Sequence, residues 1–145
     1  MSKFLNALHV TPLPDGLQWR LNTALLYESD LAGGLIQVPA QFCTDFASIP
    51  RIVWAILPPW GRYGPAAIVH DWAYWSNGMA RDVADGVLRE AMMLLGVDKA
   101  TIDQVYTAVR LFGQHAWDHN AELRAAGYKR MATGPDLAPY SGVPT

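Results

Sequence analysis

An ionisable pair, His70-Asp71, lies in the middle of an otherwise apolar stretch, GPAAIVHDWAYW. The preceding Gly64-Pro65 predicts a helix start, because proline fixes φ for the first turn and lacks an N–H that would be unpaired there. Burying an ionisable pair without partners is costly, so we expect other groups to bind both side chains. The pair therefore marks a candidate polar site inside the core.

A second helix, predicted over residues 81–95, offers a carboxylate to this pair. Its apolar residues repeat at helical spacing, and Asp85 lies at the edge of that stripe. The Ser76–Ala80 connection is short, so we expect an antiparallel helix pair with Asp85 facing His70. A carboxylate on one ring nitrogen fixes the tautomer and leaves the other nitrogen free to take a proton. A purely structural set of buried hydrogen bonds is equally compatible with the pattern.

The segment before this helix pair carries further polar candidates. Thr44, Asp45 and Ser48 can each bond nearby backbone N–H groups, which favours a turn and helix cap over a role at the site. The alternative places Asp45 in the same cleft as His70. Pro50 suits the first turn of a short helix that we expect to run through Leu57.

Arg62 and Tyr63 stand at the entrance of the His-Asp helix. There they could bind an anionic or polar group, helped by the positive end of the helix dipole. Arg62 could equally pair with Asp45 or Asp71.

A third helix, predicted from Asp98 to about Ala126, has a polar face. His115, Asp118, His119 and Glu122 fall at helical spacing on that face. Two histidines one turn apart could bind zinc, but no third ligand is identifiable, and a solvated face is favoured. On another face we expect these residues to point inward: Ile102, Val105, Tyr106, Val109, Phe112 and Ala116.

Composition bounds the classes of function. The chain has 145 residues, a net charge of −2 and 51% hydrophobic residues, which indicates one globular domain and no electrostatic nucleic-acid binding. The single cysteine, Cys43, forms no internal disulfide or thiolate metal site and is predicted to be a buried apolar residue. No clear signal peptide is present, and no apolar run is long enough for a transmembrane segment.

The fold class that these patterns predict is α+β, with one small N-terminal antiparallel sheet followed by three main helices. A single domain is expected over residues 1–131. It comprises an extended lead (1–16), strands (17–39), a loop with a short helix (40–64) and helices (65–126). Residues 132–145 are rich in Gly and Pro and are expected to form a flexible tail.

Two motifs, T-D-x-A-S-x-P at residues 44–50 and H-D-x-x-Y at residues 70–74, resemble a family carried by tailed phages and prophages. That family, domain of unknown function thirteen fifty-three, has no assigned activity. The resemblance implies a phage or prophage origin, in the host cytoplasm or in the virion, and a tail that contacts a virion or host protein. It also implies that these residues act together: Thr44, Asp45, Ser48, Arg62, Tyr63, His70, Asp71, Tyr74 and Asp85.

The helix pair is more distantly similar to that of the secreted phospholipases A2, in which a helix carries His-Asp-x-x-Tyr. His70, Asp71, Tyr74 and Asp85 correspond to those positions in order. This resemblance implies that the histidine activates a water and that Asp71 helps to bind calcium. The glycine-rich metal loop and the paired cysteines of that family are not matched here.

Two hypotheses follow for the function. The first is a small hydrolase, in which His70 is the general base, Asp85 orients it, and Asp71 with Asp45 holds calcium or magnesium. Its substrate would be a lipid ester, a cell-wall bond or a phosphodiester. The second is a phage structural, assembly or host-interaction module in which the His-Asp-Asp network is structural.

Overall fold

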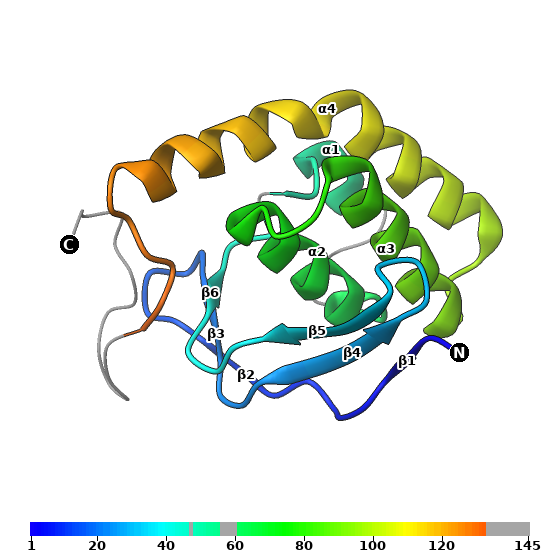
Figure 1. The fold of residues 1–145 in the computed structure, drawn as a ribbon, viewed down its shortest axis with the longest axis horizontal. Coiled ribbons are helices and arrows are strands. Elements are labelled where there is room, and N and C mark those ends of the chain that lie inside the picture. Colours follow the sequence, from blue (N-terminus) through cyan, green and yellow to red (C-terminus); the bar gives the residue numbers. More distant parts are fainter. Residues whose placement is uncertain (47, 56–60, 133–145) are drawn as a thin grey trace.

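The computed structural model describes residues 1–46, 48–55 and 61–132 of the chain. Short strands come first and helices follow, so the predicted α+β class is confirmed (Figure 1). The strands are β1 (Lys3–Phe4), β2 (Val10–Pro12), β3 (Trp19–Leu21), β4 (Leu25–Ser29), β5 (Gly34–Val38) and β6 (Cys43–Thr44). The helices are α1 (Arg51–Trp54), α2 (Gly64–Ser76), α3 (Arg81–Leu94) and α4 (Lys99–Ala125).

The strands form two antiparallel sheets, ordered β1-β4-β5 and β2-β3-β6, where the sequence predicted one. The predicted hairpin is present: β4 pairs with β5 from Leu25↔Val38 to Ser29↔Gly34. The lead at residues 1–16 is not only extended chain, because it supplies one edge strand to each sheet. Two-residue and three-residue strands leave little alternation to read in a sequence, which is why they were missed.

The segment at residues 40–64, predicted as a loop with a short helix, also contains the strand β6. Cys43–Thr44 pairs with β3, and Cys43 is fully buried, as expected for an apolar residue. Helix α1 begins directly after Pro50, which occupies the N-cap position. The predicted end of that helix, Leu57, lies outside the described residues.

The main helices match the predicted boundaries to within about one residue. Helix α2 has its proline in the first turn and ends at Ser76, and its C-cap residue Asn77 adopts the left-handed conformation. Asp98 caps α4 by accepting a hydrogen bond from the Thr101 backbone N–H at 3.1 Å. No helix in the part of the chain that the structure describes is long and apolar enough to cross a membrane.

Helix α2 is the central element of the fold. It contacts β4, β5 and β6 as well as α3 and α4. Figure 1 shows the strands on one side of α2 and the long α4 across the other side. Because α2 is covered on several faces, its side chains are buried in more than one direction. His70 and Asp71 point in different directions, and both are buried.

One inward position predicted on α4 is wrong. Ile102, Val105 and Val109 are buried, but Phe112 is 64% exposed. The next inward position is Gly113, four residues after Val109, and it lies against Tyr74 of α2. A glycine has no apolar side chain, so the predicted apolar stripe was continued at Phe112 instead of at Gly113.

Candidate functional site

His70 is held at both ring nitrogens. Its Nε2 lies 2.8 Å from Asp85 Oδ1 on α3, and its Nδ1 lies 3.1 Å from Ser48 Oγ, just before α1. All three side chains are buried. The predicted contact between His70 and Asp85 is therefore present, and Ser48 belongs to the same network.

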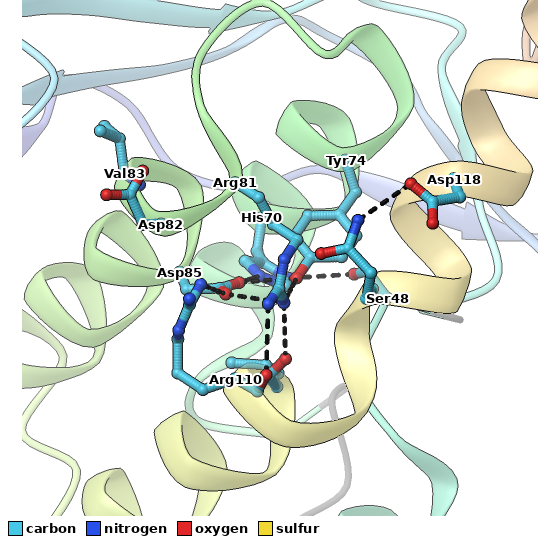
Figure 2. A network of polar contacts seen from close by, with 11 residues as sticks. Ser48, His70, Tyr74, Arg81, Asp82, Val83, Asp85, Arg110 and Asp118 are labelled. Atoms are coloured by element: carbon cyan, nitrogen blue, oxygen red, sulfur yellow. Dashed lines mark hydrogen bonds and ion pairs between the residues drawn. The ribbon is translucent and has the colours of Figure 1, made fainter.

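The Asp85 carboxylate accepts hydrogen bonds from three helices (Figure 2). Besides His70, Tyr74 donates to Oδ1 at 2.8 Å. Arg110 of α4 and Arg81 of α3 donate to Oδ2 at 2.7 and 3.3 Å. This number of donors satisfies the lone pairs of a fully buried carboxylate.

These contacts fix the protonation pattern of the network. Burial alone would raise the pKa of Asp85, but hydrogen bonds from His70, Tyr74 and Arg110 together hold it below its ordinary value. An ionised carboxylate can only accept, so His70 donates from Nε2, and the neutral tautomer that fits this contact has its lone pair on Nδ1. The lone pair on Nδ1 then faces the Ser48 hydroxyl, which donates to it.

Tyr74 and Arg81 stabilise the network where it lies against α4. Burial, followed by the charge of Asp85, raises the pKa of Tyr74 above its ordinary value, so the phenol stays protonated and donates to Asp85. Arg81 Nη1 donates to the Tyr74 oxygen at 3.2 Å and to the Val109 carbonyl at 3.0 Å. Its Nη2 donates to the Arg110 carbonyl at 3.2 Å. The arginine thus ties α3 to the backbone of α4.

Gly113 is what allows α4 to approach so closely, and Gly113→Ala should destabilise the fold. A Cβ there would overlap the Tyr74 hydroxyl oxygen and lie 3.0 Å from Arg81 Nη1. Alanine gains about 1 kcal/mol in helix propensity. Overpacking a rigid, buried ring costs about 1–3 kcal/mol. We expect the overlap to prevail and the urea midpoint to fall.

The matched control for this substitution is Gly34→Ala. Gly34 has open space around its Cβ direction and no positive φ. Its urea midpoint should therefore stay close to that of the wild type. An equal loss of stability in both variants would contradict the close-approach explanation.

Asp71 belongs to a second, separate network. Its Oδ2 accepts a hydrogen bond from Thr44 Oγ1 at 2.5 Å and from Arg130 Nη2 at 3.0 Å. The same Arg130 nitrogen lies 2.9 Å from Asp45 Oδ1. Asp71 Oδ1 is buried and has no hydrogen-bond partner among the described residues. Consecutive residues of α2 thus bind different parts of the chain.

The residues present do not fit the cation that was predicted between Asp71 and Asp45. The two carboxylates do come together, but the guanidinium of Arg130 lies between them and supplies the positive charge. Within residues 1–46, 48–55 and 61–132, no three His, Cys, Asp or Glu side chains form a group that could hold a metal ion. We therefore assign no chemical step to calcium or magnesium.

Other predicted site residues lie elsewhere. Arg62 is exposed, and its Nη1 lies 3.5 Å from the Gly96 carbonyl oxygen, so it pairs with neither Asp45 nor Asp71 in the described contacts. Tyr63 is buried in the hydrophobic core, and burial raises its pKa. The rings of His115 and His119 stack on the exposed face of α4, with centroids 5.9 Å apart.

Three arginines of these networks, Arg81, Arg110 and Arg130, were not among the predicted site residues. Arg110 lies beside the inward stripe of α4, and Arg130 follows that helix in a segment with no predicted element. Arg81, by contrast, stands four residues before Asp85, a spacing that indicates an ion pair on a helix. No comparable local signal exists for Arg110 or Arg130, because their partners lie 25 and 59 residues away.

A comparison with protein-family models matches residues 19–109 to the family described as "Protein of unknown function (DUF1353)". This match covers more than half of the chain. The chain belongs to the DUF1353 family. A search of the curated proteins and a search of the solved structures found no match.

The matched region of this DUF1353 protein contains Ser48, His70, Tyr74 and Asp85. It also contains Thr44, Asp45 and Asp71. Arg110 and Arg130 fall outside residues 19–109. The family model therefore includes the carboxylates Asp71 and Asp85. It does not include Arg130 and Arg110, the later arginines that bind them.

Proposed function

We propose that this DUF1353 protein is a small hydrolase in which His70 is the general base and acts through Nδ1. The observation that carries the proposal is the bond from Nε2 to the ionised Asp85, which directs the basic lone pair of the ring toward a hydroxyl. A general base needs this combination of fixed tautomer and adjacent proton donor. Asp85 is the orienting group, and Tyr74 and Arg81 hold it in place.

The rigidity of Asp85 supports this role. Its carboxylate is fixed by four side chains, so it would keep its position as the imidazole gains a proton and would stabilise the positive charge that forms. Arg81 and Arg110 already neutralise part of the charge on Asp85. As part of the same proposal, and on the resemblance to phage and prophage proteins, we propose that this activity operates in a phage-infected cell or a virion.

The test is turnover of a substrate panel by wild type and His70→Gln. The panel contains short-chain and long-chain carboxylic esters, phosphodiesters and purified peptidoglycan. Glutamine can retain a bond to Asp85 but cannot act as a base, so turnover should fall about 10²–10⁴-fold. Circular dichroism and a urea curve establish that the variant is folded. No turnover of any panel member by folded wild type contradicts the proposal.

His115→Ala is the control for nonspecific effects of losing a histidine. His115 is exposed and lies on α4 away from Asp85. Its replacement should leave turnover unchanged. A loss of turnover as large as that of His70→Gln would mean that the assignment of the base is wrong.

A second candidate is a phage assembly or host-interaction module. The observation that favours it is the complete burial of His70 with both ring nitrogens already bonded. Under this reading His70→Gln changes stability but no activity, and deletion of residues 133–145, which lie outside the described residues, abolishes binding to a partner. Ala132, which the sequence analysis assigned to the tail, is buried and bonds the Gln41 carbonyl through its backbone N–H at 2.8 Å.

A further inference from the structure

We propose that Ser48 is the nucleophile of this site and that the protein hydrolyses carboxylic esters through an acyl-enzyme. This inference rests on the proposed function and specifies its chemistry. A serine, a histidine and an aspartate form one hydrogen-bonded chain, from Ser48 Oγ to His70 Nδ1 and from His70 Nε2 to Asp85 Oδ1. Such a chain is recognised by geometry and roles, independently of the order of the residues in the sequence.

The direction of the hydrogen bonds favours activation of Ser48. In the neutral imidazole, donation from Nε2 to an ionised carboxylate leaves the lone pair on Nδ1, and the Ser48 hydroxyl is then the donor. A second buried serine, Ser29, makes the contrast clear. Its Oγ lies 2.8 Å from the Glu90 carboxylate with no histidine in the described contacts, so nothing orients that hydroxyl toward a neutral base.

The backbone before Ser48 is strained. Phe46 has φ of 59°, in the left-handed region that an aromatic residue rarely adopts. Two hydrogen bonds hold this conformation: the Phe46 N–H donates to Thr44 Oγ1 at 3.1 Å, and the Ile49 N–H donates to the Phe46 carbonyl at 3.0 Å. Backbone strain of this kind costs about 1–3 kcal/mol and clusters at functional sites. Here it fixes the turn that places Ser48 against His70.

The reaction balances with water as the only co-reactant. Ser48 Oγ attacks the ester carbonyl carbon, and its proton passes to His70 Nδ1. The C–O bond to the alcohol breaks, and the proton on Nδ1 goes to the departing alcohol. Water then attacks the acyl-serine, giving its proton to Nδ1. The acyl C–Oγ bond breaks, the acid leaves, and the proton returns to Ser48.

The placement of charge favours an ester over a phosphodiester. Displacement at phosphorus relies on cations around the phosphoryl oxygens. The two cations of this network, Arg81 and Arg110, bind Asp85 and so lie on the Nε2 side of His70, opposite Ser48. A neutral carbonyl group therefore suits the serine side better than an anionic phosphate.

The experiment is covalent labelling of the full chain by a small sulfonyl fluoride, with the adduct located by tandem mass spectrometry. Ser48 is only 2% exposed, so a small probe is required and labelling should be slow. We expect an adduct on Ser48 in wild type, no adduct in Ser48→Ala, and a rate at least about 10²-fold lower in His70→Gln. Ser29→Ala should label like the wild type.

A Ser48→Cys variant provides a second test that does not depend on the folding of the alanine variant. A thiol at this position keeps a donor for Nδ1, and its alkylation by iodoacetamide should depend on His70. The buried Cys43, which has no histidine among its described contacts, serves as the internal reference. Equal alkylation rates with and without His70 would overturn the assignment of Ser48 as nucleophile.

The outcomes separate this inference from the broader proposal. Ester turnover that persists in folded Ser48→Ala, without labelling of Ser48, overturns the nucleophile and leaves His70 acting on water. Labelling of Ser48 that depends on His70, together with ester turnover that is lost in Ser48→Ala, supports both the inference and the broader proposal. Absence of both labelling and turnover in folded wild type overturns the inference and the hydrolase proposal together.

Discussion

Asp85→Ala should lower the free energy of unfolding by about 3–5 kcal/mol, the effect of removing one partner from a buried charged network. The substitution leaves Arg81 with fewer acceptors and removes the carboxylate from Arg110, His70 and Tyr74. Urea denaturation followed by circular dichroism measures the change. If the loss is below about 1 kcal/mol, the network does not hold the three helices together as the contacts indicate.

The control for this prediction is Asp103→Ala. Asp103 also pairs with a cation on a helix, since its Oδ2 lies 2.6 Å from Lys99 Nζ. That pair is exposed to solvent, so the substitution should change stability little. A similar loss in both variants would mean that removal of any carboxylate destabilises the protein.

The stability supplied by Asp85 should also depend on pH. Its pKa is depressed in the folded state, so its contribution is complete above the unfolded pKa of about 4 and is lost as pH falls through the lower folded pKa. Wild type should therefore lose stability more steeply below pH 4 than Asp85→Asn does. Urea midpoints between pH 2 and pH 7 measure the difference. Parallel pH profiles would contradict the depressed pKa.

Arg130→Met should destabilise the protein by a similar amount, about 3–5 kcal/mol. The guanidinium is the cation that pairs with the fully buried Asp71 and also with Asp45. Methionine keeps much of the apolar stem and removes the guanidinium, whose Cζ lies 5.3 and 5.7 Å from the ring centroids of Phe42 and Trp75. The fall in the free energy of unfolding is therefore due mainly to the lost charge and less to lost packing. Chemical denaturation at pH 7 measures it.

Lys129→Met is the matched control, because it removes the same charge from the adjacent, exposed position. It should change stability little. A double-mutant cycle with Asp71→Asn adds a sharper criterion, since Arg130→Met should cost much less once Asp71 is neutral. Additive effects in that cycle would mean that Arg130 and Asp71 do not interact.

The sequence predicted the parts of this molecule that are encoded locally. The boundaries of α2, α3 and α4 follow from Pro65, Asn77 and Asp98 with the apolar repeats between them. The contact between His70 and Asp85 followed from two helices joined by a short connection. These signals act over a few residues, so a single sequence is enough to detect them.

The remainder depends on contacts between distant segments. Thr44 accepts a local hydrogen bond from the Phe46 backbone N–H, as predicted, but it also donates to Asp71. Asp45 pairs with Arg130, which lies far along the chain. Arg130 replaced the expected metal ion because the chain returns after α4 to pair with Phe42. Such a return carries no periodicity or motif, so it could be found only in three dimensions.

The link between Asp45 and Arg130 spans 85 residues, and it has a consequence for biosynthesis. A chain emerging from the ribosome exposes Asp71 and the edge of β6 well before Arg130 has been synthesised. Until then the carboxylate of Asp71 must stay hydrated, which opposes burial of α2. Vectorial folding should therefore stall short of the native core, and nascent chains that end before residue 130 should remain sensitive to protease.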